Sequence, residues 1–120
     1  MQLLHHAEKT KSACVDEPAL RRAFGTAWEM VATALTLLLN VANLAEVAQF
    51  ACVTLRRLAT AADGVVRFVV RHGDAEIFFR AADAALMFQE SEKQSDAVRL
   101  MQRIRVIVIE GITVPVPMPV

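Results

Sequence analysis

Apolar side chains recur at spacings of three and four residues over the first part of the chain, which is the pattern of an amphipathic helix. The pattern begins after Asp16 and Pro18 and continues to Leu38. Asp16 suits the N-cap position, and Pro18 falls in the first turn, where its missing N–H costs no hydrogen bond. These residues predict a helix from 16 to about 39, with Gly25 tolerated in its interior at a cost of about 1 kcal/mol relative to alanine.

A second helix is expected after the polar break at residues 40–43. Asn43 can cap it, and apolar residues continue along it as far as Leu58. Asp63 and Gly64 are turn-forming residues, so we expect this helix to end there.

Residues 65–79 fit two different structures. Their valines and phenylalanines flank Gly73 and Asp74, which would suit two strands around a tight turn. Asp74 would also suit the N-cap of a helix, and the alanines that follow it favour helix over strand. We predict helix, because a hairpin would pair residues 65–70 with an alanine-rich neighbour that is a poor strand former.

The C-terminal part has a mixed pattern. Ser95 or Asp96 would cap a further helix that reaches Ile104. β-branched residues then cluster over 104–114, where a strand fits at least as well as a helix. Prolines at every second position from 115 to 119 exclude helix and favour an extended, polyproline-like tail.

Composition indicates a single folded domain. The chain has 120 residues, of which 55% are hydrophobic, so it can bury a core without a metal or a disulfide. This apolar content excludes intrinsic disorder. The 13 basic and 13 acidic side chains cancel, which excludes nucleic-acid binding through bulk charge. We divide the chain into a flexible leader (1–15), a helical domain (16–110) and a proline-rich extended tail (111–120).

Membrane insertion is not expected. The longest uncharged stretch, residues 30–45, is shorter than the roughly 20 apolar residues that a bilayer crossing needs. Such an apolar helix is instead typical of a packed interior or of a surface covered by a partner. The first 18 residues hold no apolar run of signal-peptide length, and they include acids, so we expect an intracellular, cytoplasmic location.

Candidate catalytic and metal sites fail on residue type and spacing. His5 and His6, even with Cys14, do not supply the four ligands of a structural zinc site. His72 is a lone imidazole beside Gly73, and the sequence contains no nucleophile motif and no glycine-rich phosphate loop. We therefore expect no catalytic residue, no cofactor and no bound metal.

The arginines are the best candidates for polar contacts with a partner. Five of them lie in one short window: Arg56, Arg57, Arg67, Arg71 and Arg80. Guanidinium groups suit bidentate contacts with carboxylate or phosphate. Acidic residues in the same window offer ion-pair partners instead: Asp63, Asp74, Glu76 and Asp83. Of these two interpretations we favour a surface of ion pairs, because exposed pairs are common.

Aliphatic and small residues alternate with short polar breaks over residues 32–86. The segments that carry this pattern are 34–39, 46–47, 51–59, 65–66, 69–70 and 73–77. The pattern resembles the armadillo and HEAT class of helical repeats. The resemblance implies stacked antiparallel helices and a role as an interaction scaffold. It also implies a face buried against a partner, because only about two or three repeats would fit.

Our first hypothesis is a mainly α, armadillo- or HEAT-like domain with a short extended or β segment at its C-terminal end. It would be a non-enzymatic interaction or scaffold module in a homo-oligomer or a larger assembly. The expected partner-binding residues are Trp28, Arg56, Arg57, Arg67, Arg71, Ile107 and Ile109. One alternative is a compact α+β domain, with residues 65–79 as a hairpin and 104–114 as a pairing strand, that binds a small apolar ligand. Another is a membrane-associated subunit that uses residues 30–45.

Overall fold

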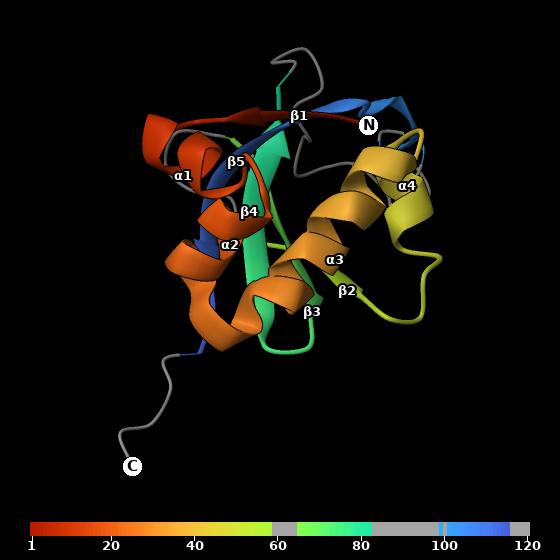
Figure 1. Cartoon of the computed structure of the whole chain (residues 1–120). Helices are drawn as coiled ribbons and strands as arrows, with labels where there is room; N and C mark the ends of the chain where they lie inside the picture. Colours follow the sequence, from red (N-terminus) through yellow and green to blue (C-terminus); the bar gives the residue numbers. More distant parts are fainter. Residues whose placement is uncertain (59–64, 83–98, 100, 116–120) are drawn as a thin grey trace.

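A five-stranded sheet with helices packed on one of its faces forms the described part of the chain (Figure 1). This computed structural model describes residues 1–58, 65–82, 99 and 101–115. In chain order the elements are β1 (Gln2–His5), α1 (Glu8–Ala13), α2 (Glu17–Phe24), the 3-10 turn η1 (Gly25–Ala27), α3 (Trp28–Asn40), α4 (Leu44–Val47), β2 (Thr54–Arg57), β3 (Arg67–His72), β4 (Ala75–Ala81) and β5 (Val106–Thr113).

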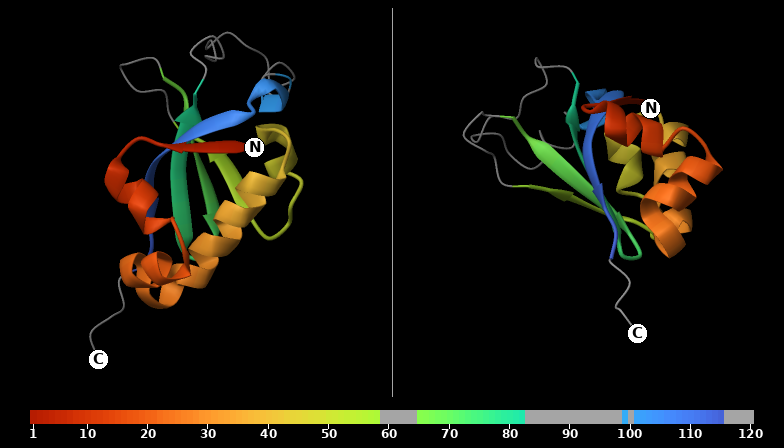
Figure 2. Two further views of the ribbon diagram at one scale, coloured as in Figure 1. Left: turned by 45° about the horizontal axis from the view of Figure 1, so that its top comes forward. Right: turned by 60° about the vertical axis from the view of Figure 1, so that its left-hand side comes forward.

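The strands follow the order β1-β5-β4-β3-β2 across the sheet. β1 runs parallel to β5, and the other neighbouring pairs are antiparallel. Figure 2 shows the helices gathered on one side of the sheet, in two layers. The sheet therefore has one face under the helices and one face turned away from them, and each strand sends alternate side chains to each face.

The prediction of a mainly α fold built from stacked antiparallel helices is wrong. The resemblance to armadillo and HEAT repeats is wrong with it, because the described chain is an α+β domain around a mixed sheet. In the described residues of the window that carried the resemblance, 32–58 and 65–82, the structure has most of one long helix, one short helix and three sheet strands instead of helical hairpins. Spacing of small and aliphatic residues did not distinguish buried strands from buried helices.

Residues 65–79 contain a β-hairpin, as in the α+β alternative. Gly73 has a φ of +58°, a left-handed conformation that glycine adopts without strain, so β3 and β4 can turn back directly. Phe68 pairs with Phe79 across the two strands, and their rings stack with centroids 5.8 Å apart. Ala75 is fully buried, so its small side chain fits a strand packed beneath the helices despite the helix propensity of alanine.

Two of the predicted helix caps exist, but the helices behind them are shorter than predicted, and the cap predicted at Asp74 lies in the turn between β3 and β4 instead. The Asp16 side chain accepts from Ala19 N at 2.9 Å at the start of α2. The Asn43 side chain accepts from Glu46 N at 3.2 Å at the start of α4. Gly25 adopts a positive φ of 57° and separates α2 from α3, so the predicted 16–39 helix is two helices.

The segment predicted as a leader, residues 1–15, contains β1 and α1. β1 is an edge strand of the sheet, with Leu3 opposite Ile107 of β5. At the other end, β5 runs to Thr113, and the tail beyond residue 115 lies outside the described residues. The same holds for the predicted helix end at Asp63 and Gly64 and for the predicted caps at Ser95 and Asp96.

The core lies between the helices and one face of the sheet. Its largest fully buried side chains are Phe68, Phe79, Leu38, Leu44, Ile77, Ile104, Ile107, Ile109, Val31, Val47 and Val70. Among the described residues, the large apolar side chains left exposed are Leu4, Val15, Leu39 and Phe50. One copy of the chain thus encloses most of the apolar side chains described here, and apolar content alone does not require a partner.

Candidate ligand-binding groove

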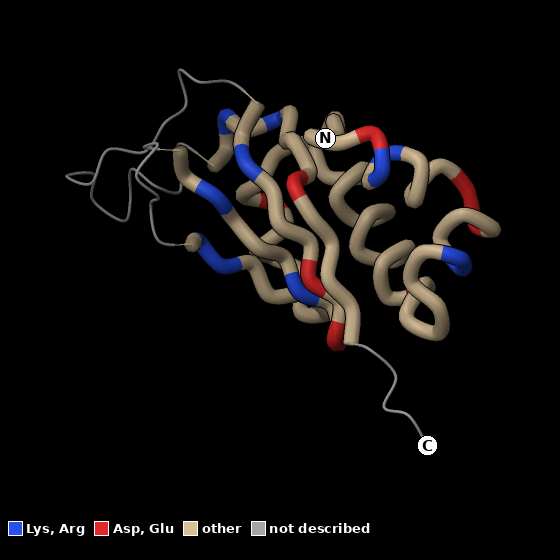
Figure 3. The backbone as a smooth tube through the Cα atoms, turned by 90° about the vertical axis from the view of Figure 1, so that its left-hand side faces the viewer, with Lys and Arg blue, Asp and Glu red and all other residues tan. Residues whose placement is uncertain are grey.

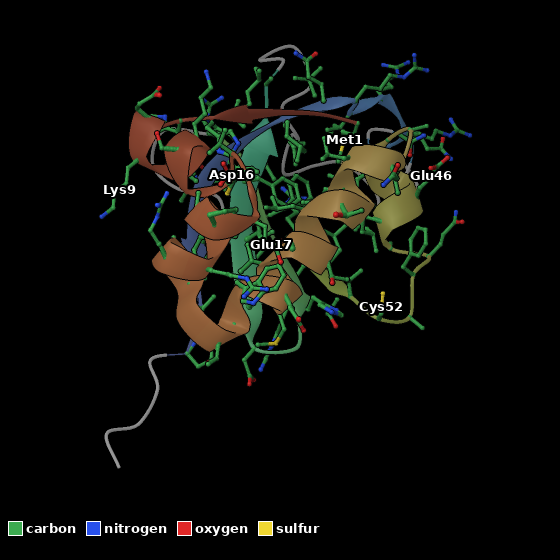
Figure 4. The ribbon with its side chains drawn as sticks, in the orientation of Figure 1. Met1, Lys9, Asp16, Glu17, Glu46 and Cys52 are labelled. Carbon is green, nitrogen blue, oxygen red and sulfur yellow. The ribbon has the colours of Figure 1, made fainter. Side chains whose placement is uncertain are left out.

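A groove lies between the exposed flank of α3 and the loop of residues 48–53 that follows α4. Its volume is about 700 Å³, within the range of sites that hold small molecules. The lining residues are Trp28, Glu29, Ala32, Thr33, Thr36, Leu37, Asn40, Val41, Glu46, Phe50 and Cys52. Figure 4 shows Glu46 on α4 and Cys52 on the loop. The groove is separate from the core, because α3 buries its opposite side, including Leu38, against the sheet.

The α3 wall of the groove is less polar than its residue types suggest. The Thr36 hydroxyl donates to Ala32 O at 2.8 Å, and the Asn40 amide donates to Thr36 O at 2.7 Å. Both polar side chains thus bond to the helix that carries them. The rest of this wall is largely aliphatic or aromatic, with Leu37 and Trp28 half-buried. The groove can therefore take apolar groups without leaving these donors unsatisfied.

The loop of residues 48–53, which forms the second wall of the groove, is held in place by a buried side chain and by backbone contacts. Val53 is buried, and Phe50 N donates to Val47 O at 3.2 Å in a tight turn. The Cys52 carbonyl lies 2.8 Å from His72 Nδ1 at the end of β3, and a carbonyl can only accept, so the imidazole proton is on Nδ1. These contacts position Phe50, 46% exposed, to line the groove from the side opposite α3.

Carboxylates mark the two ends of the groove. Glu29 is in the first turn of α3, and Glu46 is in α4, just beyond the other end of α3. One oxygen of Glu46, Oε2, accepts from Ala42 N at 2.9 Å. None of the described residues that line the groove is Lys, Arg or His. The groove is therefore apolar along its length and negatively charged.

Trp28, a residue predicted to bind a partner, lines this groove. Its ring is half-buried, and the Arg21 guanidinium lies 4.6 Å from the ring centroid. Arg21 also forms an ion pair with Glu17 at 2.9 Å on the same exposed surface of α2. The cation–π contact holds the indole against α2 and fixes it at one end of the groove.

Three of the four arginines predicted to bind a partner lie on the sheet face turned away from the helices. The strand register places Arg56 opposite Val69, and Arg71 opposite Glu76, on that face. Arg67 lies opposite Arg80 there as well. We call the side chains of Arg56, Arg67, Arg71 and Arg80 the arginine face. Figure 3 shows Lys and Arg positions in blue along the strands of the sheet. Arg57 pairs with the core residue Phe68, so it lies on the other side of the edge strand β2.

Ion pairs occupy much of the arginine face, as the favoured interpretation predicted. Arg67 Nε lies 2.8 Å from Glu110 Oε1, and Arg80 Nε lies 3.9 Å from Glu110 Oε2. Arg71 reaches Asp74 at 3.7 Å and donates to Gly73 O at 3.0 Å. Asp74 was among the predicted acids, whereas Asp63 and Asp83 lie outside the described residues. A small hollow of about 140 Å³ remains, lined by Thr54, Arg56, Val69, Arg71 and Glu76.

The other two residues predicted to bind a partner, Ile107 and Ile109, are fully buried in β5. They face the helices, so a partner could reach them only if the domain opened. β-branched side chains are favoured in strands, and both residues lie in one here, but both were predicted at a contact surface and their burial was not predicted.

No protein-family model, curated protein or solved structure matches this chain. The function must therefore be argued from the geometry of its own residues.

Sequence reasoning missed Glu46, Phe50 and Cys52 as groove residues, because it placed them on one continuous helix through residue 58. A signal for the α3 wall was present. Thr33, Thr36 and Asn40 recur at spacings of three and four on an otherwise apolar helix. Such a polar line marks the flank that does not face the core.

The described residues hold no candidate metal site and no helix that could cross a bilayer. Within residues 1–58, 65–82, 99 and 101–115, no three His, Cys, Asp or Glu side chains come together in a way that could hold a metal ion. In those ranges, too, every helix falls short of the length and apolar character that a bilayer crossing demands.

His5 is a half-buried titratable group outside the groove. Its Nδ1 has no hydrogen-bond partner, and it lies in β1 beside α1. Burial lowers the pKa of His5 below its ordinary value of 6.5, and the nearby Lys11 lowers it further, against an opposing contribution from Glu8. The folded protein therefore binds a proton at His5 less readily than the unfolded chain does.

We expect stability to fall as the pH is lowered from 7.5 through about 6.5. The unfolded state then binds more protons than the folded state, so acidification favours unfolding until His5 is protonated in both states. Urea unfolding at a series of pH values measures this slope. His5→Phe should flatten it, while His6→Phe, at the exposed neighbouring position, should leave it unchanged. An unaltered slope in His5→Phe would show that another group is responsible.

Proposed function

We propose that this chain is a binding module that holds a small apolar ligand in the groove between α3 and the 48–53 loop. The observation that supports this proposal most directly is a groove of about 700 Å³ outside the core, lined by Trp28, Leu37 and Phe50. Its main wall is a helix whose Thr36 and Asn40 side chains are already hydrogen-bonded. Binding an apolar molecule would remove the exposed part of Phe50 from water, which is favourable.

The test uses Trp28 as the reporter, because it is the single tryptophan of the chain and lines the groove. Titration with 1-octanol should change its fluorescence saturably. Thr36→Phe should fill the groove and weaken binding by about tenfold or more, as expected when a large side chain takes the ligand's place. Leu39→Phe is the matched control, because Leu39 is an exposed residue of the same helix that does not line the groove.

A second readout avoids fluorescence. Cys52 is exposed and lines the groove, whereas burial raises the pKa of the Cys14 thiol. An alkylating reagent should therefore modify Cys52 first, and octanol should slow that reaction while leaving Cys14 unaffected. Octanol that neither saturates the Trp28 signal nor protects Cys52 would overturn the proposed function.

A second candidate function is contact with an acidic protein partner through the arginine face. It is favoured by the register, which places the exposed side chains of Arg56 and Arg71 beside one hollow. Arg56 makes no ion pair with any of the described residues. Arginine is well suited to bidentate contacts with carboxylates, so the arginine face fits a glutamate-rich segment.

A fluorescently labelled glutamate-rich peptide tests this second function by anisotropy. Replacing both Arg56 and Arg71 with alanine should weaken binding by about tenfold, and added salt should do the same. Replacing Arg22 and Arg105 with alanine removes the same charge from exposed positions elsewhere and should change little. If both double variants lose the same affinity for the peptide, binding depends on net charge and not on the arginine face. Homo-oligomerisation, the intracellular location and the lack of catalytic activity stay predictions.

A further inference from the structure

We propose that the ligand of the groove is an amphipathic organic amine, with its apolar chain along α3 and its ammonium group beside Glu46. This inference rests on the proposed function, since it assigns the charge of the molecule that the same groove would hold. The groove offers a cation two carboxylates, Glu29 and Glu46, and no basic side chain among its described lining residues.

Glu46 is the better placed of the two carboxylates. It is half-buried, whereas Glu29 is exposed, so water screens the charge of Glu46 less. Its Oε2 accepts from Ala42 N, which orients the carboxylate. Among the described residues, Oε1 makes no hydrogen bond, so it is available to a donor in the groove. An ammonium group there would form a charge-assisted hydrogen bond.

The carbonyl end of α3 already holds a cation. The last carbonyl groups of a helix lack helical partners and carry partial negative charge, which suits an ammonium group. The structure already contains an ammonium group at this end, because the N-terminal amine of Met1 donates to Leu39 O at 2.9 Å and to Val41 O. Figure 4 shows Met1 and Glu46 beside the same end of α3. Val41 also lines the groove, but the Met1 amine occupies its carbonyl, so the attraction for the ammonium group of a ligand rests on the Glu46 carboxylate.

The length of α3 determines the shape of molecule that fits. The helical wall from Trp28 to Asn40 is about 18 Å long at 1.5 Å per residue. An extended alkyl chain could lie along this wall, starting from Glu46 and passing Leu37 towards Trp28. An anionic amphiphile of the same shape would bring its head group to the Glu46 carboxylate, so the groove should select against it.

Three probes with the same alkyl chain separate charge from apolar contact: n-octylammonium, 1-octanol and octanoate. Binding of each to the whole chain is followed by Trp28 fluorescence at neutral pH. We expect octylammonium to bind about tenfold more tightly than octanol, as for a hydrogen bond to a partly buried charge, and octanoate to bind more weakly than either. Added salt should reduce the difference between the amine and the alcohol.

The variant Glu46→Gln retains an oxygen that can accept from Ala42 N but removes the charge. We expect it to bind octylammonium and octanol about equally, because the carboxylate charge that distinguishes the two probes is gone. Glu8→Gln on α1 removes one negative charge outside the groove and should preserve the preference for the amine. Circular dichroism confirms that each variant folds, and the comparison of probes on the unmodified protein does not depend on any variant.

The outcomes separate this inference from the proposed function. Equal binding of amine and alcohol, or tighter binding of octanoate, would overturn the cationic ligand and leave an apolar groove. A preference for the amine that persists in Glu46→Gln would overturn the placement of the ammonium group. Failure of all three probes to bind would overturn the proposed function itself.

Discussion

Replacing Phe79 with alanine is expected to lower the free energy of unfolding by about 3–5 kcal/mol, the usual cost of removing a buried phenyl ring. Phe79 is fully buried at the centre of the face of β4 that packs under the helices. Its ring stacks on Phe68 of β3 with an interplanar angle of 19°, so the variant would also lose an aromatic contact. Urea unfolding followed by circular dichroism measures the loss.

The neighbouring Phe78 is the matched control for this prediction. It has the same side chain on the same strand but points to the sheet face turned away from the helices, where it is half-buried. We expect Phe78→Ala to cost only about 1 kcal/mol, in the range of ordinary substitutions outside the core. Similar losses in the two variants would show that the sheet does not present one packed face to the helices, which contradicts the fold.

Replacing Gly73 with alanine should cost about 1–2 kcal/mol, mainly for the first of two reasons. The first is the positive φ of 58°, which a residue with a Cβ adopts only with strain. The second is steric, since a Cβ at this position would lie closer to Met30 Sδ than van der Waals contact allows. Met30 Sδ also accepts from Asp74 N at 3.5 Å, so displacing it disturbs the turn between β3 and β4.

A double-mutant cycle with Met30→Ala separates these two reasons. In that background the steric part disappears, and Gly73→Ala should cost only about 1 kcal/mol, the conformational part. Thermal unfolding of the four proteins gives the coupling between the two sites. A cost of Gly73→Ala that is unchanged by Met30→Ala would show that α3 does not press on the hairpin turn as the structure has it.

The hairpin matters to the groove as well as to stability. His72 is the last residue of β3, next to Gly73, and its imidazole holds the Cys52 carbonyl on the loop wall. A disturbed turn should therefore loosen the side of the groove that carries Phe50. We expect Gly73→Ala to weaken octanol binding, in contrast to Phe78→Ala, whose side chain lies on the far sheet face.

Residue type alone predicted some of the residues that line the groove and the arginine face. Trp28 lines the groove, on a helix as predicted. Arg56, Arg67 and Arg71 share one sheet face, although each of these arginines was predicted on a helix. Glu46 and Phe50 were not predicted, because their role depends on α4 ending after four residues. After α4 ends, the chain forms the loop wall of the groove. No residue pattern in the sequence predicted that the helix would end there.

The sequence by itself determined the helix starts at Asp16 and Asn43 and the possible turn at Gly73. These features depend on interactions between residues three or four positions apart, or on the φ of a single glycine. Only the tertiary structure decided between hairpin and helix for residues 65–79. Strand pairing joins β4 to β5 across a long stretch of chain, and burial of Ala75 under the helices outweighs its weak local preference for helix. The arginine face follows from that pairing, because its residues come from different strands of the sheet. The groove depends on the hairpin only through the contact of His72 with the Cys52 carbonyl.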